Sequence, residues 1–178
     1  MTMMLPQITN PHRVLIQAGM WVHRNSDCIS FELLLTPDQA TIRYFRGEGP
    51  WWEDFLVGEQ RVPAKVATDF IAGVNAVIGR EDRFVNWGRS GTQYHARISE
   101  GPAGTAHLLE IDSDDLTREV LREVASDPAQ RPEVAEYARS ALARDPFNRA
   151  YAVFRLAQAF AHALGYDVPP PVAPRYGD

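Results

Sequence analysis

The hydrophobic pattern of the chain changes near Asp112. Before this residue, short apolar runs alternate with turn residues; after it, up to Gly165, apolar residues recur at helical spacing. Short runs bounded by turns are typical of strands, whereas a period of three to four residues is typical of amphipathic helices. The pattern therefore predicts a sheet-rich part over residues 12–112 and a helical part over residues 113–165.

The first part is predicted to form one antiparallel sheet. The expected strands are Arg13–Val22, Cys28–Leu35, Ala40–Arg46, Trp51–Val62, Phe84–Trp87, Thr92–Ser99 and Thr105–Asp112. Most of them are joined by segments rich in Gly, Pro, Asp and Asn, which favour tight turns. The strongest hairpin turn is 101–104, where Pro102 suits a type I turn and Gly104 suits the left-handed position after it. We expect a sheet of about five to seven strands.

One helix is predicted between the strands. Apolar residues from Val66 to Ile78 recur at helical spacing and form one face. Pro63 suits the first turn of a helix, and Gly79 suits its C-terminal end. We expect this helix, residues 63–79, to cover one face of the sheet.

Three more helices are predicted after the sheet. They begin at Ser113, at about Pro132 and at Phe147, and Asp-Pro pairs separate them. The last, Phe147–Leu164, is apolar on most sides, which is typical of a central helix. The Pro-rich tail 166–178 cannot continue it. The predicted fold class is α+β, a single domain over 1–178 with a covering helix and a C-terminal three-helix layer.

The charge and composition of the chain make some classes of protein unlikely. The formal net charge of -5 argues against a general nucleic-acid binder, because such proteins gain affinity by neutralising phosphates. Lys65 is the only lysine among 18 basic residues, which together with many alanines indicates a GC-rich, bacterial genome. We find neither a signal peptide nor a run of the ~18 apolar residues that a membrane span needs. A cytoplasmic protein with no membrane partner is expected.

The sequence contains no recognisable catalytic or metal-binding motif. No pair of its five histidines is spaced as H-x-x-x-H, and none adjoins an acidic cluster at ligand spacing. Cys28 is the only cysteine, so an intramolecular disulfide is excluded, and we expect a buried, inert thiol. We therefore expect no metal, no cofactor and no catalytic residue.

His95 and His107 belong to one predicted hairpin, for which two registers stay open. With a two-residue loop, Ile98 faces His107, and the two histidines lie on opposite faces of the sheet. With a bulge, the histidines share a face and His107 lies opposite Ser99, with His95 roughly 13 Å away. Neither register allows both histidines to hold one ion.

Aromatic and basic residues concentrate in two segments. Trp51 and Trp52 follow a tight turn, and residues 83–97 interleave arginines with aromatic rings. Such a strip could stack nucleic-acid bases, but the acidic balance favours a sheet face on which arginine stems cover the rings. Because Trp and Arg are enriched at binding hot spots, we expect a contact surface here. Its candidate residues are Trp51, Trp52, Trp87, Arg89, Tyr94 and Arg97.

The expected function is protein binding without catalysis. By class analogy with immunity proteins, antitoxins and adaptors, an acidic surface would steer toward a basic protein partner and aromatic anchors would hold it. Residues 113–145 contain eight acids and five arginines and are the expected steering surface. Two alternatives stay open: a structural assembly subunit, and an enzyme or small-molecule-binding protein with a pocket between sheet and helices. The polar groups of that pocket would be Tyr94, His95, Arg97, His107 and Glu110.

Overall fold

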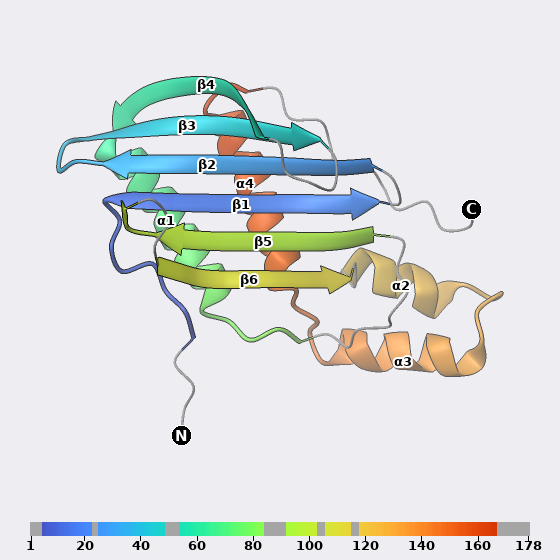
Figure 1. Ribbon diagram of the computed structural model, residues 1–178. Helices are drawn as coiled ribbons and strands as arrows, with labels where there is room; N and C mark the ends of the chain where they lie inside the picture. Colours follow the sequence, from blue (N-terminus) through green and yellow to red (C-terminus); the bar gives the residue numbers. More distant parts are fainter. Residues whose placement is uncertain are drawn as a thin grey trace.

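The computed structural model describes residues 5–22, 25–48, 54–83, 92–102, 106–114 and 118–166. The first strands are β1 (Arg13–Val22), β2 (Asn25–Leu35), β3 (Gln39–Glu48) and β4 (Asp54–Pro63), followed by helix α1 (Ala64–Ile78). The chain continues with β5 (Thr92–Glu100), β6 (Ala106–Asp114), α2 (Arg118–Ser126), α3 (Pro132–Ala143) and α4 (Arg149–Ala163) (Figure 1). The predicted α+β class is confirmed. The predicted strand Phe84–Trp87 lies outside the described residues.

The six strands form one antiparallel sheet in the order β4-β3-β2-β1-β5-β6. The chain meanders from β1 in the middle to β4 at one edge. Helix α1 then returns across one face of the sheet, and β5 and β6 extend the other side (Figure 1). Pro63 and Gly79 flank α1 as predicted. Both α1 and α4 lie on the same face, so the opposite face is not covered by a described helix.

The main core lies between these two helices and one face of the sheet. Along β1, alternate residues from Val14 to Met20 point toward the helices and are buried. Phe31 of β2 packs edge-on against Phe70 of α1 and Phe160 of α4, with ring centroids 5.6 and 5.0 Å away. Phe70 and Phe160 stack on each other at 4.0 Å. This aromatic trio joins the sheet and both helices at one point.

Helices α2 and α3 pack on each other beside one end of the sheet (Figure 1). Their contact forms a separate apolar cluster of Val120, Leu121, Val124, Ala138 and Ala141. Of the three C-terminal helices, α4 is the one that covers the sheet, next to α1. Helix α3 begins at Pro132, as predicted, and ends at Ala143, just before the Asp145-Pro146 pair.

The predicted start of the first C-terminal helix at Ser113 is wrong. Ser113 still belongs to β6, and α2 begins at Arg118. The Ser113 hydroxyl is buried and donates to Asn148 Oδ1 at 2.7 Å. The same oxygen accepts the backbone N–H of Tyr151 at 3.0 Å, so Asn148 caps α4. Ser113 therefore ties β6 to the start of α4 and does not cap α2.

Two side chains tie the segment before β1 to the core. Glu100, at the end of β5, is only 7% exposed, and its carboxylate accepts the N–H groups of Thr9 and Asn10 at 2.8 and 2.7 Å. It also accepts the Thr9 hydroxyl at 3.0 Å. Asn75 of α1 accepts Ile8 N–H at 2.7 Å and donates to Ile8 O at 3.2 Å. These bonds satisfy a buried carboxylate and hold Ile8 in the core.

Glu100→Gln should lower the free energy of unfolding by about 1–3 kcal/mol. Both carboxylate oxygens of Glu100 accept hydrogen bonds, and the carboxamide replaces one of them with an NH₂ group, which cannot accept. Denaturant titration measures the loss. Glu110→Gln on β6 is a matched control at an exposed position and should change stability by less than about 1 kcal/mol. Equal effects of the two substitutions would contradict the role assigned to Glu100.

The hydroxyl of Tyr44 is buried without a hydrogen-bond partner among the described residues. Tyr44 is 1% exposed, and its ring packs against those of Phe31 and Tyr166 at centroid distances of 5.3 and 4.6 Å. Burial raises the pKa of Tyr44, because the phenolate would lose its hydration. The ring therefore stabilises the core while its hydroxyl opposes folding.

Tyr44→Phe should raise the free energy of unfolding by about 1–2 kcal/mol, because it keeps the ring contacts and removes an unsatisfied polar group. The difference should grow as the pH rises above the ordinary tyrosine pKa of 10.0. In that range the unfolded wild type releases a proton that the folded wild type retains, so the wild type loses stability. Urea titrations on both sides of this pH measure the effect. A wild type as stable as the variant would contradict it.

Candidate functional site

Charged side chains cross the sheet face that points away from α1 and α4. Arg43 of β3 bonds Glu59 of β4 at 2.6 Å and Glu32 of β2 at 3.2 Å, and Arg13 of β1 reaches Glu32 at 2.5 Å. These hydrogen bonds, that to Glu59 foremost, raise the pKa of Arg43. The Glu32 carboxylate is nearly buried between two cations. This row links four neighbouring strands and is a cross-strand ladder.

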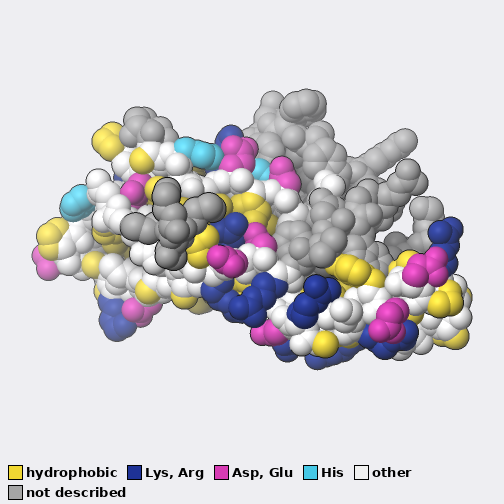
Figure 2. Space-filling model, turned by 90° about the horizontal axis from the view of Figure 1, so that it is seen from below, with side chains coloured by type: hydrophobic (Ala, Val, Ile, Leu, Met, Phe, Trp, Pro, Cys, Tyr) yellow, Lys and Arg dark blue, Asp and Glu magenta, His cyan; other side chains and the backbone are white. Residues whose placement is uncertain are grey.

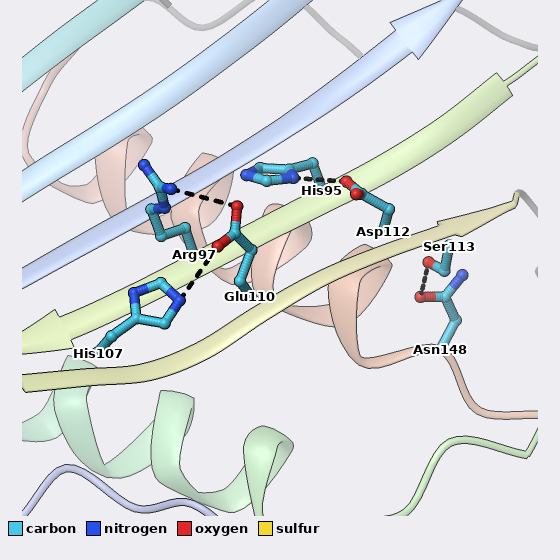
Figure 3. Close-up of polar contacts among 7 residues, drawn as sticks. All are labelled: His95, Arg97, His107, Glu110, Asp112, Ser113 and Asn148. Atoms are coloured by element: carbon cyan, nitrogen blue, oxygen red, sulfur yellow. Dashed lines mark hydrogen bonds and ion pairs between the residues drawn. The ribbon is translucent and has the colours of Figure 1, made fainter.

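A second polar group, the β5–β6 cluster, lies on the same face and consists of His95, Arg97, His107, Glu110 and Asp112 (Figure 3). His95 Nδ1 lies 2.6 Å from Asp112 Oδ1. Both oxygens of Glu110 are engaged, one by Arg97 at 3.2 Å and the other by His107 at 3.2 Å. In this cluster, Asp112 orients the ring of His95, and the Glu110 carboxylate is shared by Arg97 and His107.

A bulge brings this cluster to one face. Ile98 of β5 pairs with Leu109, whereas the next residue, Ser99, pairs with His107, so Leu108 is an extra residue in β6. In a regular strand, His107 and Glu110 would face opposite sides. The structure thus selects the bulged register of the two that the sequence left open, with His107 opposite Ser99.

The side chains of the β5–β6 cluster form hydrogen-bonded pairs at the surface. Asp112 is exposed, and Arg97, Glu110 and His107 are each about half exposed. Exposed pairs of this kind contribute about 0–1 kcal/mol each. Within the described ranges, no group of three or more His, Cys, Asp and Glu side chains is placed to hold a metal ion. The cluster therefore adds side-chain contacts across the β5–β6 pair.

Cys28 is buried on this face, as the sequence predicts. Its Sγ lies 3.7 Å from Ser30 Oγ. Four of the six predicted contact residues, namely Trp51, Trp52, Trp87 and Arg89, lie outside the described residues, and their assignment stays a prediction.

The other two predicted contact residues face opposite sides of β5. Tyr94 is 3% exposed, and its ring packs edge-on against Tyr151 of α4 at 4.9 Å. Arg97 lies on the outer face and is paired with Glu110. The two residues are three positions apart, and side chains at odd spacings along a strand point to opposite faces of the sheet. Tyr94 therefore belongs to the core, and it shares neither a contact surface nor a pocket with Arg97.

An exposed apolar run on β4 was not predicted. Phe55, Leu56 and Val57 are 65%, 56% and 51% exposed, and β4 is an edge strand of the described sheet. Tyr44 pairs with Gly58 and Phe45 with Leu56, so Val57 is the extra residue of a bulge. The signal in the sequence is three consecutive apolar residues, which by themselves are equally compatible with a buried strand.

The two edges of the sheet differ in chemistry. The β6 edge presents His107, Glu110 and Asp112, and charged side chains at an edge disfavour pairing with another strand. The first half of β4 presents the apolar run instead. Among the described strands, none pairs with the outer side of β4.

Comparison with known proteins does not extend these observations. No protein-family model matches the chain, and no curated protein is significantly similar to it. Within the described part of the chain, no helix combines the length and the apolar character that crossing a membrane requires. Surface geometry and charge are therefore the features of the molecule that bear on its function.

Proposed function

We propose that the protein acts by binding another protein at the first half of β4. The observation that carries this proposal is the exposed run Phe55–Val57 on an edge strand. An edge strand offers unpaired backbone groups, to which an extended segment of a partner can add as a further strand. Apolar side chains beside those groups supply contact area. The partner would thus contribute an extended apolar segment.

The predicted aromatic anchors adjoin this run in the sequence. Trp52 precedes Phe55 by three residues, and Trp51 precedes it by four. Tryptophan supplies large contact area in binding hot spots. We therefore place the proposed interface on the continuous segment 51–57.

The charge of the chain supports a basic partner. A formal net charge of -5 attracts a cationic protein, whereas two copies of this chain repel each other. On α2 and α3, Glu119, Glu123 and Glu133 form no ion pair within the described residues. These helices lie across the sheet from β4 (Figure 1), so their acids act on the approach of the partner and do not border the apolar contact.

Leu56→Lys and Val57→Lys should each weaken the affinity for the partner at least about tenfold, because a charge would face the apolar contact. The partner is first isolated from a native lysate with the wild-type chain. Dissociation constants are then measured by calorimetry with purified proteins. Ala106→Lys adds the same charge to the β6 edge and should leave the affinity unchanged.

Two results would contradict the proposal. One is a partner that binds both β4 variants as tightly as the wild type, although circular dichroism shows that they are folded. The other is a purified wild-type chain that forms dimers or larger assemblies in light scattering and becomes monomeric on Leu56→Lys. In that case a second copy of the chain occupies β4, as expected for a structural assembly subunit.

A further inference from the structure

We propose a second binding site, at the helical end of the molecule, for a small flat aromatic molecule that carries one anionic group, a carboxylate or a phosphate. A cavity of about 660 Å³ lies between the end of α1, the start of α2, the loop 145–148 and α4. This volume is in the range of small-molecule sites. The cavity is lined by helices and loop residues, whereas the pocket considered from the sequence would lie between the sheet and the helices. The inference is independent of the β4 interface.

Part of the wall of this helical cavity is apolar and aromatic, and the rest is polar or charged. Val77 of α1, Phe147 of the loop, and Tyr151 and Leu156 of α4 line it. Sites for small molecules are usually lined in this way, with a few polar groups that fix the orientation of the ligand. A flat apolar body fits these walls, since aromatic rings pack against other rings in offset or edge-on geometry.

Two arginines at the cavity lack a carboxylate partner among the described residues. The Arg80 guanidinium lies over the Phe147 ring, 3.5 Å from its centroid. Its flat face is thereby held, while its N–H groups stay available at the edge. Arg155 donates to the neutral side chain of Gln158 at 3.1 Å. By contrast, four arginines of the sheet are each paired with a carboxylate, namely Arg13, Arg43, Arg46 and Arg97.

The charge of the lining is complementary to one anionic group. Three arginines and two acids line the cavity, which leaves a net charge of +1. The third arginine, Arg118, is already paired with Asp145. In the view of Figure 2, Lys and Arg side chains gather with acidic ones in the lower half of the surface. A monoanion can pair with Arg80 or Arg155 without displacing an existing ion pair.

The cavity is held in shape before any ligand binds. Asp82, after α1, accepts the backbone N–H of Arg149 at 2.8 Å and its Nε at 2.9 Å. Arg83 and Phe147 exchange two backbone hydrogen bonds, at 2.9 and 3.4 Å. These bonds fix the end of α1 against the start of α4. Arg80 follows α1 and Phe147 precedes α4, so the same bonds hold these two residues in place. A preorganised site loses less free energy on binding.

Three probes with one ring system test the site: 2-naphthoate, 2-naphthyl phosphate and the neutral 2-naphthamide. At least one of the two anions should bind the wild-type chain about tenfold more tightly than the amide in a calorimetric or fluorescence titration. The anion with the higher affinity identifies the group that the site prefers. Wild-type protein that binds no probe, or that binds all three equally, overturns the proposal.

Arg80→Gln and Arg155→Gln should each reduce the affinity for the preferred anion at least about fivefold and leave that for the amide unchanged. Arg122→Gln is the matched control, because this exposed arginine of α2 does not line the cavity. Leu56→Lys should also bind the probes as the wild type does, which separates this site from β4. Retained affinity in both cavity variants, or an equal loss in Arg122→Gln, overturns the proposal.

Discussion

The contact of Phe31 with both Phe70 and Phe160 is the interaction on which the rest of the structure depends. It holds α1 and α4 on the same face of the sheet, and alternate strand residues on that face form the main core. The other face then has no described helix to cover it, and ion pairs across neighbouring strands stabilise it. The two proposed binding sites lie away from this face, at the β4 edge and at the helical end of the molecule.

Local patterns were sufficient for the elements that form the core. The apolar alternation of β1 and the helical periodicity of α1 and α3 predict these elements closely, because neighbouring residues determine them. The misplaced helix start at Ser113 has a different cause. Its hydroxyl bonds Asn148, 35 residues away, and no local pattern reports such a partner. Glu100 and Thr9 are separated even further, by 91 residues.

The candidate sites were harder to predict from the sequence. Two of them depend on β-bulges, and the third is a cavity lined by residues that are far apart in the sequence. The bulges at Val57 and Leu108 decide which side chains share a face, and they depend on the pairing of two strands. Strand alternation alone, however, already separates Tyr94 from Arg97. Arg80 and Arg155 meet at one cavity only after α1 and α4 have docked on the sheet.

The claim that β4 is an open edge is tested most directly by hydrogen exchange in the free protein, measured amide by amide. Backbone N–H groups of β4 that point away from β3 should exchange at rates close to those of an unfolded chain, because no described strand pairs with them. Amides of β1 and β2 should exchange only on global unfolding. Equal protection along all of β4 and β1 would contradict the account, since it would show that the edge is already covered.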